Sequence, residues 1–173
     1  MKKAVIFFIA IIIFSGSATN AYAAGNKERY VEKNNFSIAI PESWEVVTVK
    51  GLKYKILRGA FENNFSPTIN FVDEKFDGEL DEYIEYFMDQ IDSIFDENRE
   101  YIFHGEFKTL KELTGRLLVI TSFQQEMLIQ FNYFLFPRND GRYIIITCSN
   151  LANNNASFNE LYINTIRTFE LLR

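Results

Sequence analysis

Cysteine and histidine are nearly absent from this sequence of 173 residues, which holds one of each, Cys148 and His104. A single cysteine cannot form an internal disulfide, and an ordinary structural zinc site needs four nitrogen or sulfur ligands. Serine or cysteine nucleophiles need a histidine base, and His104 stands in a strand-like run without a nucleophile signature near it. We therefore expect Cys148 to be a buried, inert thiol and His104 to be a surface or partly buried strand residue.

Positive charge is also scarce, because 18 lysines and arginines face 23 aspartates and glutamates, for a net charge of −5. Binding to nucleic acid or to an anionic membrane surface requires lysine and arginine to neutralise phosphates, so neither partner is expected. The sequence also lacks a glycine-rich phosphate loop and a dinucleotide fingerprint. No cofactor is expected for this chain.

Long apolar runs are missing as well, since the longest near the amino terminus covers only residues 4–14. A membrane-spanning helix needs about 20 apolar residues. Two lysines precede this run and the small residues Ala21 and Ala23 follow it, which predicts a cleavable signal peptide over residues 1–23. No cysteine for lipidation lies near the cleavage site. We expect an exported protein, periplasmic or extracellular, with no stable membrane anchor after cleavage and a net charge of −7.

The rest of the chain predicts a polar, mobile leader over residues 24–34 and a single domain over residues 35–173. Alternating or continuous apolar runs between turn residues predict eight strands, over residues 36–40, 44–49, 53–61, 68–72, 101–109, 115–124, 127–136 and 142–149. The connections are short, which favours antiparallel neighbours because parallel strands need a long crossover.

Two helices complete the predicted fold. Apolar side chains recur with a period of 3.6 from Leu80 to Phe95, which is typical of one amphipathic helix. Ser157 and Glu160 have the spacing of a capping box, which predicts that a second helix begins there. Four strands, a helix, four strands and a helix predict an α+β fold in which two main helices flank a single antiparallel sheet.

The segment from Phe36 to Trp44, in which a short strand runs into Pro41 and then a tryptophan, resembles the opening of PsbP-like and DcrB-like domains. An acidic helix that begins Leu-x-x-Tyr at Leu80 and a short helix that ends in Thr-Phe at Thr168 extend the resemblance over residues 34–171. It implies the layered sheet and helices of the PsbP–Mog fold, in accessory or binding proteins more often than enzymes. DcrB-type proteins resemble envelope lipoproteins, and this sequence departs from them in lacking the lipidation cysteine.

The predicted first helix carries an unusual excess of acids, because residues 77–97 hold nine carboxylates and no base. Five of them follow helical spacing opposite the apolar stripe: Asp81, Glu85, Asp89, Asp92 and Asp96. This face is either a solvated surface that aids solubility, or a docking face for a basic partner or a weak site for divalent cations.

Two further features are interpreted as structural. Trp44 follows a proline turn and is expected to anchor the core or the end of a sheet, with its ring buried and its N–H hydrogen-bonded. The segment 73–78 superficially matches a calcium loop, but Lys75 and Ile84 occupy positions that need oxygen ligands. We therefore expect no metal site there, and expect its acids to solvate a loop and cap the following helix.

These observations together predict a non-catalytic binding or assembly module of the bacterial envelope. We expect a monomer that binds an unknown envelope protein or a small ligand. The alternatives are a hydrolase that uses carboxylates alone, or a protein that binds a small ligand or a divalent cation. A deep pocket that joins two carboxylates would favour the enzyme, and an exposed apolar patch would favour the module.

Overall fold

The structure is a computed structural model that describes residues 28–33 and 35–172, so the predicted signal peptide over residues 1–23 lies outside the described residues. The elements follow in the order β1 (Arg29–Glu32), β2 (Phe36–Ala39), β3 (Glu45–Val47), β4 (Ile56–Arg58), β5 (Thr68–Lys75), α1 (Leu80–Phe95), η1 (Asp96–Asn98), β6 (Arg99–Lys108), β7 (Thr114–Gln124), β8 (Met127–Pro137), β9 (Arg142–Leu151), η2 (Ala152–Asn154), α2 (Asn155–Arg167) and β10 (Glu170–Leu171). Over the described ranges, no helix has the length and apolar character needed to span a bilayer.

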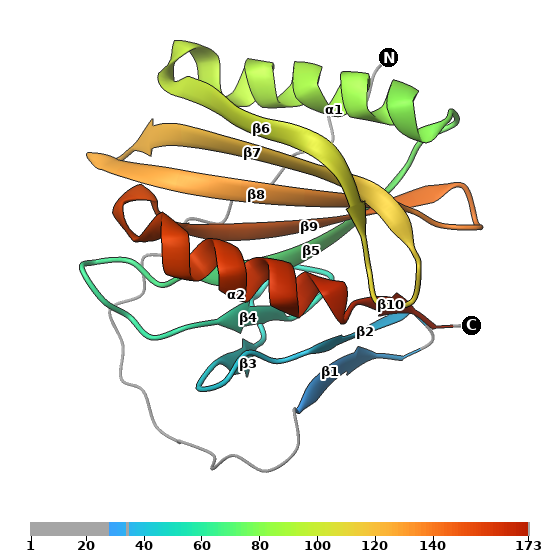
Figure 1. The fold of residues 1–173 in the computed structure, drawn as a ribbon, viewed down its shortest axis with the longest axis horizontal. Coiled ribbons are helices and arrows are strands. Elements are labelled where there is room, and N and C mark those ends of the chain that lie inside the picture. The colour runs from blue at the N-terminus through green and yellow to red at the C-terminus, as the bar shows by residue number, and fades with distance from the viewer. Residues whose placement is uncertain (1–27, 34, 173) are drawn as a thin grey trace.

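The strands form two antiparallel sheets (Figure 1). Seven of them make a large sheet in the order β3-β4-β5-β9-β8-β7-β6, and β1, β2 and β10 make a small one. The predicted α+β class with two main helices is confirmed, but the expected single sheet is wrong, because β2 pairs with β1 and β10 rather than with the large sheet.

Part of the predicted mobile leader is ordered. Residues 29–32 form β1, which pairs with β2 and buries Tyr30 to 6% exposure. The ring of Tyr30 lies 5.6 Å from that of Phe36 and 5.7 Å from that of Phe71. One inward aromatic side chain among charged neighbours is too weak a pattern to predict a strand, so this strand could not be expected from the residues alone.

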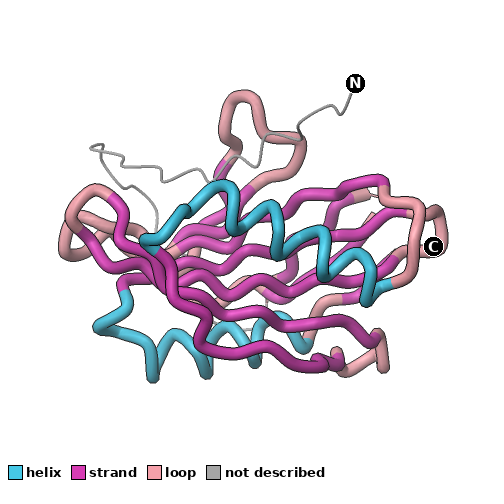
Figure 2. The backbone as a smooth tube through the Cα atoms, turned by 90° about the horizontal axis from the view of Figure 1, so that it is seen from above, coloured by secondary structure: helices cyan, strands magenta, loops and turns pink. Residues whose placement is uncertain are grey.

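Each face of the large sheet packs against a different layer (Figure 2). One face packs against α2 and the small sheet, and the other packs against α1. Alternate residues of β9 enter the two cores, with Ile144 and Ile146 on the α2 side and Tyr143 and Ile145 on the α1 side. Burial on both faces explains why the central strands are apolar almost without interruption. Cys148 is fully buried on the α2 side, and burial raises the pKa of its thiol, which agrees with the predicted inert cysteine.

The predicted helix over residues 80–95 matches α1, whose apolar stripe is buried. At its start the Glu82 carboxylate accepts a hydrogen bond from the Glu79 N–H at 3.1 Å, which satisfies one backbone donor of the first turn. The capping box predicted for α2 is wrong. This helix begins at Asn155, and the Ser157 hydroxyl donates to the Asn154 carbonyl at 3.3 Å instead of capping a backbone N–H.

The acids of segment 73–78 also differ from expectation, because Asp73 and Glu74 lie within β5. The Asp73 side chain is only 3% exposed and accepts hydrogen bonds from Lys53 and Arg142, both at 2.6 Å. Glu74 accepts hydrogen bonds from the hydroxyls of Tyr83, at 3.0 Å, and Tyr86, at 3.3 Å. Asp73 therefore links β5 to Lys53 and to β9, and Glu74 links β5 to α1. Neither carboxylate solvates a loop.

The contacts of Asp73 predict that the stability of the fold decreases in acid. Burial acts to raise the pKa of Asp73, but the hydrogen bonds from Lys53 and Tyr54 and the charges of Lys53 and Arg142 outweigh it, so the pKa lies below its ordinary value of 3.8. A depressed pKa contributes stability above that ordinary value, and the contribution is lost as the pH falls through the folded-state pKa.

We expect Asp73→Asn to lower the free energy of unfolding by about 1–2 kcal/mol at neutral pH, since charged hydrogen bonds are lost while the freed cations remain partly solvated. Urea unfolding at several pH values measures this effect. The difference between the native protein and the variant should shrink below about pH 4. A difference that is constant down to the acid range would contradict the ionised state of Asp73.

Candidate binding surfaces

The outer edge of the large sheet is β6, a strand of ten residues that pairs only with β7 in the large sheet. Three consecutive large apolar side chains on it are exposed: Tyr101 (38%), Ile102 (52%) and Phe103 (50%). An edge strand presents unpaired N–H and C=O groups, and proteins usually protect such edges with charge or cover them. The apolar side chains on β6 are therefore an unusual feature.

A β-bulge sets the directions in which these side chains point. The register with β7 shifts between Tyr101, which pairs with Ile120, and Phe103, which pairs with Val119, so Ile102 is left without a partner residue. Tyr101 therefore faces the α1 side of the sheet and Phe103 faces the α2 side.

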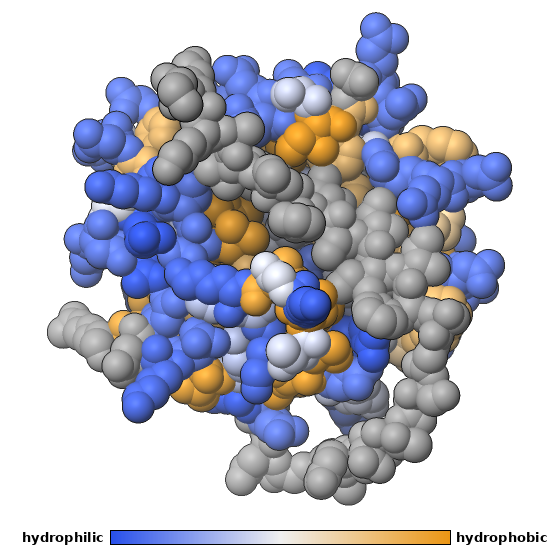
Figure 3. All heavy atoms as spheres, turned by 180° about the vertical axis from the view of Figure 1, so that it is seen from behind, coloured by the Kyte–Doolittle hydropathy of each residue, from blue (hydrophilic) through white to orange (hydrophobic). Residues whose placement is uncertain are grey.

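Two further exposed apolar side chains lie on the same face as Phe103. Phe123 and Leu128 pair with each other across the β7–β8 hairpin and are 56% and 48% exposed. We refer to the three exposed residues of β6, Tyr101, Ile102 and Phe103, as the β6 surface. From behind, the molecule shows mostly polar side chains around smaller apolar areas (Figure 3).

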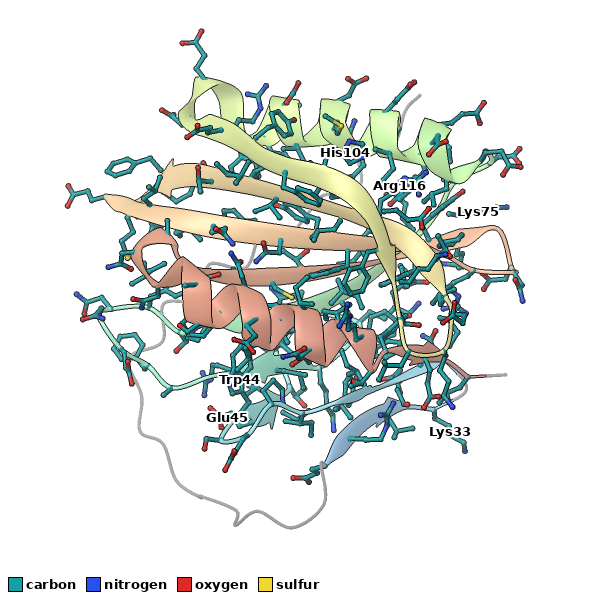
Figure 4. The ribbon with its side chains drawn as sticks, in the orientation of Figure 1. Lys33, Trp44, Glu45, Lys75, His104 and Arg116 are labelled. Carbon is teal, nitrogen blue, oxygen red and sulfur yellow. The ribbon has the colours of Figure 1, made fainter. Side chains whose placement is uncertain are left out.

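The predicted acidic face lies on α1, beside β6. Its members Asp81, Glu85, Asp89 and Asp92 are all exposed, and Asp96 belongs to η1. Two of them form ion pairs with the sheet. Asp81 pairs at 2.7 Å with Arg116 of β7, which is labelled in Figure 4, and Asp92 pairs with Arg99 of β6 at 2.6 Å.

Asp92 also accepts a hydrogen bond from the hydroxyl of Tyr101, so it connects the acidic face to the β6 surface directly. This hydrogen bond, followed by that from Arg99, lowers the pKa of Asp92 and holds it as a carboxylate. Burial and the neighbouring Asp92 raise the pKa of Tyr101, so its hydroxyl stays protonated and donates. The two other members of the acidic face on α1, Glu85 and Asp89, have no ion-pair partner among residues 28–33 and 35–172.

A pocket of about 320 Å³ lies where the turns before β3 and after β4 meet the end of β9 and the start of α2. Two tight turns and the start of α2 shape it. Pro41 accepts a hydrogen bond from the Trp44 N–H at 3.1 Å, with Ser43 at a φ of 64°, and Glu62 and Phe65 pair around a two-residue hairpin turn. The lining residues are Glu42, Ser43, Trp44, Ala60, Glu62, Phe65, Pro67, Asn150, Leu151, Asn154, Ser157, Phe158 and Leu161. We refer to this site as the Trp44 pocket.

Trp44 is less buried than expected. It is half-buried beside α2 (Figure 4), where its ring makes an edge contact with the ring of Tyr162 at 6.2 Å. A Cβ added at Gly59 would come within 2.9 Å of the indole ring, so the ring packs closely on a backbone that only glycine leaves open. The predicted role as an anchor fits these contacts, but part of the ring remains at the pocket, and no hydrogen bond of its N–H is found within the described residues.

The geometry gives little support for catalysis. Glu42 and Glu62 both line the Trp44 pocket, but both are exposed, whereas a catalytic pair of carboxyls usually has one member in apolar surroundings. His104 is an exposed residue of β6 (Figure 4), as predicted. Within the described ranges, no three histidine, cysteine or acidic side chains are grouped so that they could hold a metal ion.

No protein-family model matches the sequence, and no curated protein is similar to it in sequence. Solved structures do match. The cyanobacterial PsbP protein CyanoP from Synechocystis has a TM-score of 0.63 at 14% identity, over 90% of this chain and 99% of that one. LpqN, which is involved in cell envelope biogenesis of Mycobacterium tuberculosis, has a TM-score of 0.62 at 10% identity, over 80% and 83% of the two chains.

The Ran-binding protein Mog1p of Saccharomyces cerevisiae is a third match, with a TM-score of 0.57 at 10% identity, over 85% of this chain and 97% of that one. Identities this low establish the fold alone. The resemblance of the segment from Phe36 to Trp44 implied this fold, and the arrangement of the two helices and the large sheet confirms it. The chain has a PsbP/Mog1-like fold.

Proposed function

We propose that this chain is a non-catalytic binding or assembly module of the bacterial envelope, which docks a partner protein through the β6 surface. The observation that carries the proposal is the exposure of Tyr101, Ile102 and Phe103 in a row on an edge strand. Exposed apolar groups on one part of a surface mark interaction sites in soluble proteins. The similarity to LpqN, a protein of cell envelope biogenesis, agrees with an envelope role.

The surroundings of the β6 surface favour a partner with basic residues. Glu85 and Asp89 lie on the helix beside β6 without an ion pair among the described residues, and the chain as a whole carries a net charge of −5. The outer edge of β6 can also accept a partner strand through backbone hydrogen bonds. The partner we propose is therefore a protein segment whose apolar side chains are flanked by lysine or arginine.

We expect the double substitution Ile102→Ser and Phe103→Ser to weaken partner binding by about 30-fold or more, because a few central apolar side chains carry most of the affinity of an interface. The affinity is measured by surface plasmon resonance with the partner isolated from envelope extracts. Leu110→Ser is the matched control, because Leu110 is 69% exposed but lies in the β6–β7 connection. An equal loss in both variants, or in neither, would contradict docking at the β6 surface.

The acidic face is tested in the same experiment. Glu85→Gln with Asp89→Asn should slow association by about two- to tenfold and reduce its salt dependence, since exposed charges steer encounter. Asp92 is left unchanged because it holds Arg99 and Tyr101 in place. An unchanged association rate would mean that these carboxylates form only a solvated surface. It would contradict the proposal that the partner is basic.

The proposed location rests on the signal peptide over residues 1–23. We expect the amino terminus of the protein recovered from the periplasm or the medium to begin at Ala24, within one residue, because the small side chains of Ala21 and Ala23 fit signal peptidase. Amino-terminal sequencing measures this. A product in the cytoplasm that retains residues 1–23 would contradict export.

A further inference from the structure

We propose that the Trp44 pocket binds an aliphatic chain that ends in an ammonium group, the chemistry shared by a lysine side chain and a free alkylamine. The pocket is lined by the end of β9, the start of α2 and the turns that flank β3 and β4, and it shares no residue with the β6 surface. It is therefore a second site, and its occupancy does not depend on docking at the β6 surface.

The pocket has the size and the walls of a ligand site. Its volume of about 320 Å³ falls at the lower end of the range of about 300–1,000 Å³ typical of such sites. Trp44, Phe158 and Leu161 contribute apolar surface, and all three are only partly buried against the core. A narrow aliphatic chain can cover this surface without moving the backbone.

The charge of the lining favours a cation. Glu42 and Glu62 stand on two different turns and both reach the pocket, while none of the described residues that line it is a lysine, arginine or histidine. Both carboxylates are exposed, so each can attract an ammonium group only modestly. The half-exposed indole of Trp44 adds an attractive aromatic face for the same group.

The start of α2 acts in the opposite sense. Asn154 and Ser157 line the pocket, so the amino-terminal end of the helix, which carries about half a positive charge, lies near it. Two full negative charges on Glu42 and Glu62 exceed that partial charge. The balance therefore selects an ammonium group over a carboxylate.

Trp44 is the only tryptophan of the chain, so its fluorescence reports on the pocket directly. We suggest titrating the purified protein with hexylammonium, hexanol and hexanoate, which share one chain and differ in charge. Hexylammonium should bind about tenfold more tightly than hexanol, and hexanoate should bind most weakly. Equal binding of hexylammonium and hexanol, tightest binding of hexanoate, or no fluorescence change with any of them would each overturn the proposal.

Substitutions test whether the two ligands bind in the Trp44 pocket. Glu42→Gln and Glu62→Gln should each weaken hexylammonium binding by about two- to fivefold and leave hexanol binding unchanged, whereas Glu97→Gln, on an exposed residue of η1, should change neither. Ala60→Phe should fill the pocket and abolish binding of both ligands. Ala60 is exposed, and thermal unfolding verifies that this variant folds. Loss of hexylammonium binding in Glu97→Gln, or full binding in Ala60→Phe, would contradict the assignment.

A last arm distinguishes the two sources of the ammonium group. Nα-acetyl-lysine amide carries its ammonium group on a four-carbon side chain with peptide groups attached, and it is compared with hexylammonium under the same conditions. Tighter binding of the lysine derivative supports the proposal and identifies a lysine side chain of a protein as the ligand. Tighter binding of hexylammonium supports it with a free amine as the ligand.

Discussion

Replacing Phe36 by alanine is expected to lower the free energy of unfolding by about 3–5 kcal/mol, the usual cost of deleting a buried aromatic ring. Phe36 is fully buried and belongs to β2 of the small sheet. Its ring lies 4.8 Å from that of Phe71 in the large sheet and 5.6 Å from that of Phe169, which follows α2. The substitution therefore leaves a cavity where the small sheet, the large sheet and the end of the chain meet.

Urea unfolding measures the loss. Phe61→Ala is the matched control, because Phe61 is 51% exposed and its deletion should change the free energy of unfolding by no more than about 0.5 kcal/mol. If Phe36→Ala cost no more than Phe61→Ala, the small sheet would not be packed on the large one as described.

Replacing Gly115 by alanine is expected to cost about 2–3 kcal/mol, at the upper end of the usual cost of overpacking. A Cβ there would meet the backbone carbonyl oxygen of Leu135 and approach the ring of Phe136 to 2.5 Å. The neighbouring pair of Arg116 and Leu135 holds β7 and β8 in register, and Phe136 is fully buried. Alanine otherwise stabilises a strand by about 0.5–1 kcal/mol relative to glycine. The clash outweighs this gain, so the substitution is expected to be destabilising.

Gly105→Ala provides the control in the adjacent strand. A Cβ at Gly105 would come within 2.7 Å of the end of the Phe103 ring, but this ring is half-exposed and can rotate away. We expect a change of no more than about 0.5 kcal/mol by the same urea measurement. If both substitutions lowered the free energy of unfolding equally, the contact with the Leu135 carbonyl would not be the reason that alanine destabilises position 115.

The sequence predicted the helices and the central strands well because their patterns are strong. The apolar stripe from Leu80 to Phe95 has the period of a helix, and β7, β8 and β9 are long apolar runs between short turns. The small sheet was missed because β1 has one inward side chain, Tyr30, and β10 has two residues. Their pairing with β2 brings residues 29–39 together with residues 170–171, which no local pattern indicates.

The candidate sites were only partly predictable. The acidic face on α1 follows from spacing along one helix, but its ion pairs with Arg99 and Arg116 need the sheet. Tyr101, Ile102 and Phe103 read like the buried runs of β8 and β9, and only the position of β6 at the edge shows that they are exposed. The Trp44 pocket joins four separate segments, so the sequence held no signal for it beyond the tryptophan itself.

The central claim is that the β6 surface contacts a partner, and photo-crosslinking in the native host tests it most directly. Phe103 is replaced by a photoreactive phenylalanine analogue, with the same replacement at Leu110 and Phe61, which are exposed but lie outside the β6 surface. We predict a light-dependent adduct with one envelope protein from position 103 and none from the other two positions. No adduct from position 103, or the same adduct from all three, would contradict docking at the β6 surface.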